Sequence, residues 1–342
     1  MTAKKRYDAL SSDRSPFLNT ADEATKLTLP YLITRDENQS SARNLSTPWQ
    51  SVGAKGVVAL ASKLMLATLP PQTSFFKLQL NDSELGEDFP PELRSELDLS
   101  FAKIERTILE SIAASNDRVV IHQALKHLVV AGNVLIFMGK EGLKMYPLNR
   151  YVLERDGNGN VIEIVTKERI NKKLIEDELP KDLLENQSIV DEYSDTSPDN
   201  DCDVYTHVRR EGNKFVWHQE VYGHKLKNSN GNSPIDSTPW LPLRFNSVDG
   251  ENYGRGRVEE FMGDLKSLEA LSQALVEGSA AAAKVVFTIS PSSTTKPQTL
   301  ANAGNGAIVQ GRPDDIGVVQ VGKTADFATA YQMSQTIEKR LS

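Results

Sequence analysis

The sequence predicts an α+β protein, and three observations lead to that prediction. Helical spacing and strand alternation are interleaved over residues 1–250. The next segment carries one unbroken helical pattern of about 30 residues, on the order of 45 Å long as a helix. A short stretch rich in Ser, Thr, Pro and Gly follows, and then a second helical pattern. Such a layout has little core of its own, so it favours packing against neighbouring copies. The alternative is a long core helix within one large domain.

Composition and charge are those of an ordinary folded chain. Its 342 residues, 39% hydrophobic and 25% charged, are enough for roughly two or three domains. The net charge of −7 argues against a protein that coats nucleic acid, although it does not exclude DNA nearby. Cys202 is the only cysteine, so we expect no disulfide framework. No segment reaches the roughly 18 apolar residues of a membrane span, and the first residues lack the apolar centre of a signal peptide.

Residues 1–46 are expected to form an N-terminal arm. They are polar, with little periodicity before residues 21–31. We expect one short helix at residues 21–31, preceded by a mobile beginning.

Residues 47–250 are expected to form one mixed α+β body with antiparallel strands in two ranges, 134–166 and 204–246. Helical spacing and strand alternation predict helices at residues 47–69, 91–114, 118–131 and 174–184, and strands at 75–80, 134–138, 143–147, 151–155, 161–166, 204–209, 215–222 and 240–245. Residues 185–203 are acidic and poor in aromatic residues, which indicates an exposed loop.

Residues 256–288 are expected to form the long helix. Apolar side chains recur at three- and four-residue steps, which keeps them on one stripe: Val258, Phe261, Leu265, Leu268, Leu275, Ala282 and Val286. Residues 278–283 are nearly all small, which lets another backbone come close. Pro291 prevents continuation of the helix.

Residues 290–327 are expected to form the tip, with short strands at 307–310 and 318–321. Residues 328–342 are expected to begin the returning helix, with Ala330, Met333 and Ile337 on one side. No Gly or Pro stops that helix before Ser342, so we expect either that the chain is truncated or that the helix is completed by something outside this sequence.

The loop before the long helix, with Gly250, Gly254, Arg255 and Gly256, could hold a phosphate at the helix N-terminus. Its spacing matches neither the dinucleotide fingerprint nor the phosphate loop, and acidic residues occupy the first turn. A nucleotide- or phosphate-binding enzyme using residues 250–256 is therefore the alternative hypothesis. The five histidines have poor metal spacing, and no nucleophile with its base is recognisable, so we expect no enzyme, no metal and no cofactor.

Several blocks in the same order resemble one family. The chain is similar to the head-to-tail connector, or portal, proteins of short-tailed double-stranded DNA phages of the autographivirus type. The resemblance covers nearly the whole chain, with a poor match at residues 185–203. It is carried by TPWQSVGAKGVVALASKLMLATLPPQ with Phe75 and Phe76, HQALKHLVVAGNVLIF, DVYTHV, DGENYGRGRVEEFMGDLKSLEAL, VQGRPDDIGVVQVGKTADF and TIEKRLS.

The resemblance implies a portal fold assembled as a ring, usually a dodecamer, at one capsid vertex of the virion. DNA passes through its channel during packaging and ejection, and no membrane is involved. Implied partners are the terminase large subunit, tail adaptor and tail tube proteins, capsid and scaffolding protein, with assembly in the host cytoplasm. In portal terms, residues 47–250 are the wing, 256–288 the stem helix, 290–327 the clip and 328–342 the start of the returning stem helix. The tunnel helix and crown of the family are absent from this sequence.

Two sets of residues are candidates for portal function. Basic residues that could contact DNA phosphates in the channel are Lys266, Lys284, Lys296, Arg312 and Lys323. Inter-subunit ion pairs or solvated charges are the favoured alternatives for them. Candidates for the subunit interface are Phe261, Leu265, Leu268, Leu275, Ala281 and Ala282.

Overall fold

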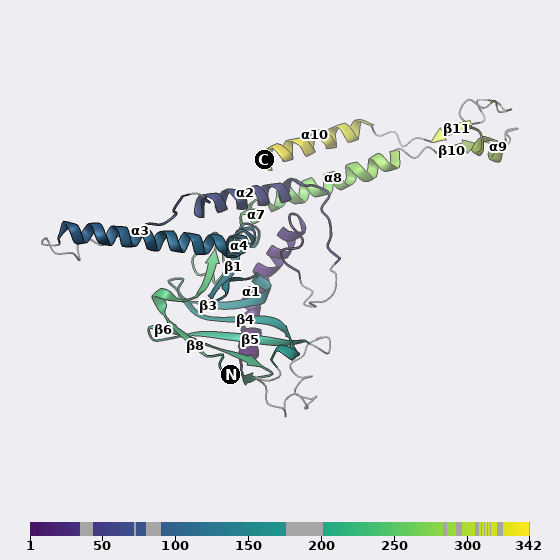
Figure 1. Cartoon of the computed structure of the whole chain (residues 1–342). Coiled ribbons are helices and arrows are strands. Elements are labelled where there is room, and N and C mark those ends of the chain that lie inside the picture. Colours follow the sequence, from purple (N-terminus) through teal and green to yellow (C-terminus); the bar gives the residue numbers. More distant parts are fainter. Residues whose placement is uncertain are drawn as a thin grey trace. The chain divides into compact units, whose positions relative to one another are not determined.

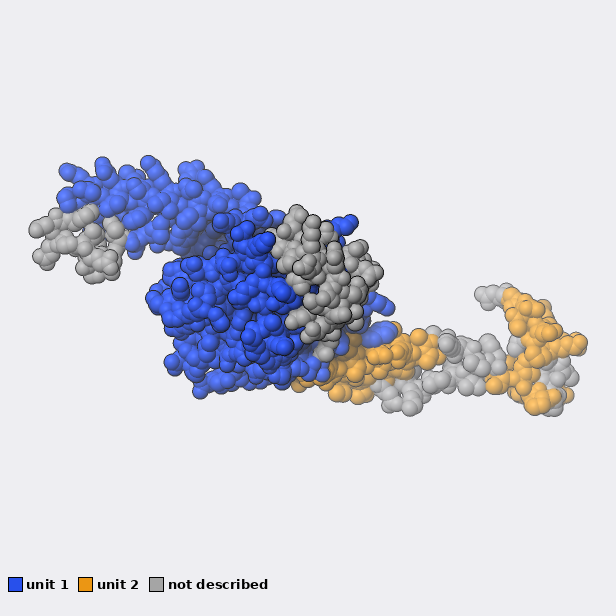
Figure 2. All heavy atoms as spheres, turned by 90° about the horizontal axis from the view of Figure 1, so that it is seen from below, with its two compact units in different colours: residues 1–262 blue, residues 263–342 orange. Residues whose placement is uncertain are grey.

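The computed structural model describes residues 1–34, 44–71, 73–79, 90–175, 201–282, 286–291, 296–304 and 324–341, with residues 308, 310, 312, 314 and 316–319. The chain divides into two compact units, residues 1–262 and residues 263–342, coloured separately in Figure 2. Unit 1 mixes helices and antiparallel sheets, and unit 2 holds helices and a short two-stranded sheet (Figure 1). The predicted α+β class is confirmed. None of the helices among the described residues is long and apolar enough to cross a membrane.

Unit 1 begins with a long helix, α1 (Ala3–Lys26). The expected mobile beginning and short helix at residues 21–31 are therefore wrong. The Thr2 side chain caps the helix by accepting from the Lys5 amide, and Tyr7 packs against Tyr205 with ring centroids 5.6 Å apart. The guanidinium of Arg14 is buried and donates to the Tyr151 carbonyl at 2.9 Å. The covered side chains of this helix recur at three- and four-residue steps, but alanines and the buried Arg14 interrupt the large apolar residues of that stripe: Ala3, Tyr7, Leu10, Arg14, Phe17, Ala21 and Ala24.

Three helices follow in unit 1: α2 (Val52–Thr68), α3 (Pro91–Ala114) and α4 (Asp117–Ala131). α3 and α4 lie at their predicted positions, whereas the predicted start of α2 at Thr47 is wrong, because the helix begins at Val52. α2 packs on α4 through Gly53, Val57, Ala61 and Met65, which recur every four residues. The strand predicted at residues 75–80 is wrong over the described part, 75–79. Here the Leu78 amide donates to the Glu105 carboxylate at 2.5 Å and pairs with no strand.

Two antiparallel sheets complete unit 1. The first has the order β2-β1-β9, formed by β1 (Asn133–Gly139), β2 (Gly142–Tyr146) and β9 (Trp240–Arg244). The second has the order β3-β4-β5-β6-β7, with β8 also paired to β6. Its strands are β3 (Tyr151–Arg155), β4 (Val161–Asn171), β5 (Asp201–Glu211), β6 (Lys214–Val221), β7 (His224–Lys225) and β8 (Gly231–Pro234). Short 3-10 turns are η1 (Leu148–Arg150), η2 (Lys172–Leu174) and η4 (Ile235–Ser237). The helix expected at 174–184 and the loop at 185–203 lie mostly outside the described residues.

The main core of unit 1 lies where these sheets meet α1 and α4. Tyr151, Tyr253 and Leu135 are among its fully buried side chains. The Tyr253 hydroxyl accepts a hydrogen bond from the Leu153 amide at 3.0 Å, and its ring lies 5.3 Å from that of Phe17. Tyr253 therefore holds the loop of residues 249–256 against both α1 and β3.

The long helix predicted at residues 256–288 is divided and shorter in the structure. A single turn, α7 (Arg257–Glu260), is followed at Phe261 by α8 (Met262–Ala282). The predicted end at Thr288 is wrong, because Val286–Ile289 form strand β10. The sequence there is Val, Phe, Thr and Ile, and β-branched and aromatic side chains favour a strand when a partner strand is present.

The partner strand, β11 (Ile316–Val319), starts two residues before its predicted position. A short helix, α9 (Pro297–Ala301), lies between the two strands in the sequence, and α10 (Thr324–Leu341) follows them. The strand predicted at residues 307–310 is not formed at the described positions Ile308 and Gln310. Residues 307 and 309 lie outside the described residues.

Candidate functional site: the helix pair, its tip and the glycine-rich loop

α8 and α10 form an antiparallel pair within unit 2. At one end of the pair, Arg340 donates to Asp264 at 2.7 Å. At the other end, Gly278 faces the ring of Phe327, so closely that a Cβ on Gly278 would lie 2.4 Å from Phe327 Cε1. The two contacts are 14 residues apart on α8 and 13 residues apart on α10, as expected for antiparallel helices (278 − 264 and 340 − 327). The absence of a side chain at Gly278 thus leaves space for the Phe327 ring. The helical periodicity of the sequence did not reveal this contact.

The tip is the two-stranded sheet of β10 and β11, paired from Val286 with Val319 to Ile289 with Ile316. The Thr288 hydroxyl donates to the Gly317 carbonyl at 3.2 Å. A Cβ on Gly317 would lie 2.6 Å from that hydroxyl oxygen, so the glycine allows the contact. The tip therefore has its own strand pairing.

The interface candidates lie in different environments. Leu265 and Leu268 are buried in the single chain, at 3% and 0% exposure, so neither side chain is open to a neighbouring copy. Leu275 is half-buried and Ala281 is exposed, while the side chain of Ala282 lies outside the described residues. Phe261 is half-buried at the break between α7 and α8, with the Arg257 guanidinium 4.9 Å from its ring centre.

Three exposed apolar side chains on the helix pair were not among the sequence candidates. Val276 on α8 is 53% exposed, and Tyr331 and Met333 on α10 are 57% and 55% exposed. The sequence placed Met333 on one stripe with Ile337, yet Ile337 is buried. A single sequence shows which residues share a helix stripe but not which stripe the chain itself covers.

The basic candidates are exposed where they are described. Lys266 lies on α8, Lys296 precedes α9, and Arg312 lies in the segment before β11. Lys284 and Lys323 lie outside the described residues.

The glycine-rich loop of residues 249–256 packs against the end of α4. The Asn133 side-chain amide makes two hydrogen bonds of 2.7 Å to the backbone of Gly254, one as donor and one as acceptor. A Cβ on Gly254 would lie 2.9 Å from the Gly132 carbonyl oxygen, and one on Gly256 would lie 2.4 Å from the Val130 carbonyl oxygen. Close backbone packing thus accounts for both glycines.

The same geometry argues against a phosphate site in this loop. The Gly254 amide is bonded to Asn133, and the Arg255 amide donates to the Asn246 carbonyl at 2.8 Å. The Arg255 side chain lies between Glu251 and Glu259, at 2.5 and 2.8 Å. Its hydrogen bond lowers the pKa of Glu251, so that carboxylate is charged and would repel an anion.

A hollow of about 680 Å³ borders the loop, lined in part by Arg155 and Arg244. The Arg155 guanidinium donates to three backbone carbonyl oxygens at 2.9 to 3.0 Å, and Arg244 donates to the Glu251 carbonyl at 3.0 Å. Asp156 and Asp249 also line the hollow. Both arginines therefore donate to protein backbone, and the two aspartates would repel an anion in this hollow.

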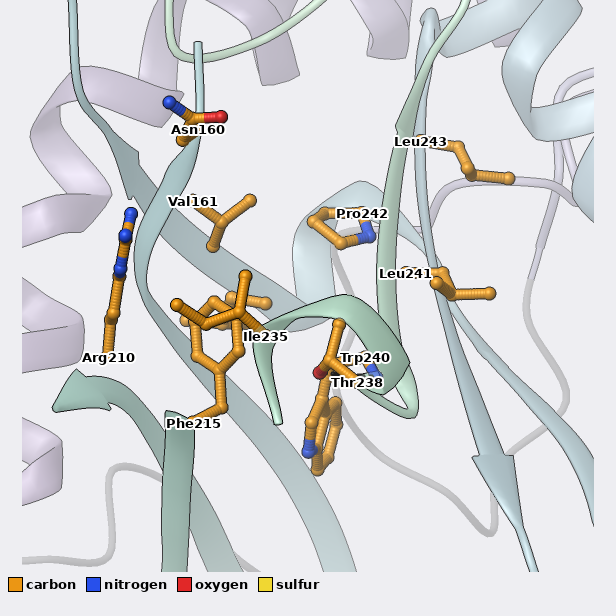
Figure 3. Close-up of a pocket in the computed structure, with 11 residues that line it drawn as sticks. Asn160, Val161, Arg210, Phe215, Ile235, Thr238, Trp240, Leu241, Pro242 and Leu243 are labelled. Carbon is orange, nitrogen blue, oxygen red and sulfur yellow. Dashed lines mark hydrogen bonds between the residues drawn. The ribbon is translucent and has the colours of Figure 1, made fainter. Parts of the chain in front are cut away.

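A second hollow of about 360 Å³ lies between β4, β6 and β9 (Figure 3). In the close-up, Val161, Phe215 and Ile235 point toward one another, and Trp240 and Pro242 approach from β9. Arg210 is the single ionisable side chain of its lining. An apolar hollow of this kind has no nucleophile or general base.

Buried ionisable groups join α1 to the second sheet. The Ala3 amide donates to Glu220 at 2.6 Å, and Arg6 donates to Glu163 at 2.6 Å. His207 also contacts the Glu163 carboxylate. Burial alone would raise the pKa of Glu163, but the hydrogen bonds from His207 and Arg6 outweigh burial, and the pKa is lowered. These contacts hold α1 against the second sheet. No group of three potential metal ligands occurs among the described residues.

These features define a class of protein: an α+β chain with an antiparallel helix pair and a small β tip.

The chain belongs to the bacteriophage head-to-tail connecting protein family, whose model matches residues 1–342. It is 37% identical to the portal protein of Escherichia phage T7 over 349 positions, which cover 99% of this chain and 64% of that protein. The portal protein of Enterobacteria phage T3 is also 37% identical, over 348 positions, with the same two coverages. The chain thus spans 64% of the length of these relatives. The resemblance to portal proteins of T7-like phages is confirmed.

Among solved structures, the virion of a native gene transfer agent particle is similar at a TM-score of 0.34. That likeness has 11% sequence identity and covers 66% of this chain and 55% of the other. So low a TM-score supports no conclusion about fold or function.

Proposed function

We propose that the chain is a portal subunit, which assembles into a ring channel at one capsid vertex for DNA packaging and ejection. One observation carries the proposal: 37% identity over 99% of this chain to two proteins named portal protein. Identity at that level over the full chain applies to many independent segments, so it does not depend on a single motif. A dodecamer in the virion, assembled in the host cytoplasm, is the form we expect.

The two units suggest how such a subunit is divided. We assign residues 47–250 to the wing, α7 and α8 to the stem, residues 290–327 to the clip and α10 to the returning stem helix. The antiparallel contacts of Gly278 with Phe327 and of Asp264 with Arg340 support the stem assignment. A helix pair with exposed Val276, Tyr331 and Met333 offers apolar surface to neighbouring copies.

The partners follow from the proposed role. Double-stranded DNA would pass through the ring without sequence specificity, and the terminase large subunit and then tail adaptor or tail tube proteins would dock at the clip. Capsid and scaffolding proteins would surround the wing. The net charge of −7 supports a channel that does not grip DNA, since many phosphate contacts would slow transport.

Lys266, Lys296 and Arg312 are exposed and suit sparse phosphate contacts in the channel. Inter-subunit ion pairs and solvated charge remain the alternatives. Changing all three to Gln and measuring DNA packaged per capsid over a series of salt concentrations separates them. Channel contacts predict a change in the salt dependence of packaging, whereas solvated charges predict none. Inter-subunit pairs predict fewer rings before any DNA is added.

Negative-stain electron microscopy of the purified chain tests the ring itself. We expect rings with a central hole; particles that remain monomeric at high protein concentration would refute the proposal. Ala281→Trp adds bulk on an exposed position of the stem and should reduce rings by overpacking the neighbouring helix, with little effect on the folded monomer. Ala9→Trp, at an exposed position of α1, is the matched control and should leave ring formation unchanged.

A further inference from the structure

α3 is a helix of 24 residues that the chain leaves largely uncovered. None of its described side chains, residues 92–114, is buried. Figure 1 shows it extending as a single rod past the rest of unit 1. Six of its apolar side chains nevertheless form one continuous stripe at three- and four-residue steps: Leu93, Leu97, Phe101, Ile104, Ile108 and Ile112. On this stripe Leu93, Ile104 and Ile108 are 49%, 47% and 38% exposed, and Leu99, which is 64% exposed, lies outside it. A stripe of this length on an uncovered helix indicates a binding surface.

α2 carries a second uncovered apolar surface. Its inner side packs on α4, and the opposite side, which we call the outer face of α2, is exposed. That face is formed by small and apolar residues with two lysines: Lys55, Val58, Ala59, Lys63 and Leu66. Val58 is 39% exposed and Leu66 is 59% exposed. Surface helices usually carry acidic and basic residues on their outer side, but α2 carries no acidic residue at all.

The charges of the two helices are complementary. α3 has five acidic and three basic residues, a net charge of −2 (3 − 5), whereas α2 has two lysines and a net charge of +2. Contact between two copies of α3, or between two copies of α2, would bring like charges together. Contact between α3 and α2 brings opposite charges around two apolar surfaces. The charges therefore favour contact of α3 with α2 over contact between two copies of the same helix.

We propose that the apolar stripe of α3 packs against the outer face of α2 in the neighbouring copy of this chain. The inference rests on the proposed ring, because a head-to-tail ring needs two different, complementary surfaces on every subunit. Both surfaces belong to unit 1, and the chain's own α2–α4 contact leaves the outer face open. The contact would thus link unit 1 of one subunit to unit 1 of the next, independently of the helix pair in unit 2.

Cysteine cross-linking in the assembled full chain tests this contact. Ile104→Cys lies in the middle of the α3 stripe, and Ala59→Cys lies in the middle of the outer face of α2. The two thiols therefore come close whether α3 and α2 pack in parallel or antiparallel. The native Cys202 can stay, because it is buried and burial raises the pKa of its thiol to about 11. With a short bismaleimide, the double variant should give a ladder of covalent multimers beyond the dimer. Arg106→Cys with Ala59→Cys places the thiol on the opposite side of α3 and is the matched control.

The outcomes are distinguishable. Rings by electron microscopy with a ladder for the Ile104 pair and none for the Arg106 pair support the inference. Rings without a ladder, or with equal ladders for both pairs, overturn it and leave the proposed function standing. Absence of rings in the unmodified chain refutes the proposed function, and the inference with it.

A charge exchange gives a second test. Lys55→Glu with Lys63→Glu changes α2 from +2 to −2, and Glu96→Lys with Asp98→Lys changes α3 from −2 to +2. Each double variant should form several-fold fewer rings at low salt, and the quadruple variant should recover them. Failure of the quadruple variant to recover, although each double variant folds with the parent circular dichroism spectrum, contradicts the α3–α2 contact.

Discussion

Replacing Gly132 by alanine tests the close packing between the end of α4 and the glycine-rich loop. Gly132 follows the last residue of α4 with a φ of 72°. A Cβ at this position would lie 2.4 Å from the Arg255 carbonyl carbon and 2.5 Å from the Gly256 nitrogen. Both neighbours are backbone atoms, so neither can move away as a flexible side chain would. The Gly132 carbonyl also accepts from the Phe245 amide at 2.9 Å, which ties it to the chain just after β9.

The expected cost has two parts. A left-handed backbone costs a non-glycine residue about 1 to 2 kcal/mol. Forcing an extra carbon into a packed site costs roughly 1 to 3 kcal/mol more. The sum, about 2 to 5 kcal/mol, is a large share of the roughly 5 to 15 kcal/mol that holds a domain folded. At about 2 to 4 °C per kcal/mol for a unit of this size, Gly132→Ala should lower the melting temperature of unit 1 by roughly 4 to 20 °C.

The measurement is thermal unfolding followed by circular dichroism or calorimetry, at one scan rate and at a concentration where the chain is not assembled. Gly56→Ala is the matched control: it lies inside α2, and its new Cβ would meet nothing within 4 Å. Alanine should stabilise that helix by about 0.5 to 1 kcal/mol. If Gly132→Ala melts within 1 °C of Gly56→Ala, the packing argument is refuted.

Three further predictions concern the helix pair and one buried histidine. Gly278→Ala should displace Phe327 and speed amide exchange in α10, and adding Phe327→Ala should restore protection; unchanged exchange in Gly278→Ala would contradict the contact. Arg340→Ala removes an ion pair with Asp264 whose side chains are 58% and 34% exposed, so stability by denaturant titration should fall by no more than about 1 kcal/mol. Burial lowers the pKa of His127 to about 4 from the ordinary value of 6.5. The unfolded chain then binds one more proton between pH 6.5 and 4, so stability should fall as the pH falls through that window, by about 1.4 kcal/mol per pH unit at most. His127→Gln should remove this part of the slope, and an unchanged slope would show that His127 is not its source.

The sequence located most elements of unit 1 because apolar spacing and turn residues are local signals. α3, α4 and the strands β1 to β6 lie within a few residues of their predictions. α1 was missed although its inner side chains are periodic, because alanines and the buried Arg14 take several places on that stripe, and the contacts of Arg14 with the Tyr151 carbonyl and of Arg6 with Glu163 join residues distant in the chain. The glycine-rich loop was noticed, but its hydrogen bonds to Asn133 join residues 121 positions apart.

The sequence by itself determined the α+β class, the order of the elements and the family, because spacing along the chain and similarity to relatives need no coordinates. Tertiary structure decided the rest. It ended the long helix before Val286, since Val286–Ile289 can form a strand only when β11 pairs with it. It also decided which apolar stripes are covered: Leu265 and Leu268 are buried, whereas the stripe on α3 and the outer face of α2 stay open. A stripe is a local property, but its covering depends on residues distant in the chain.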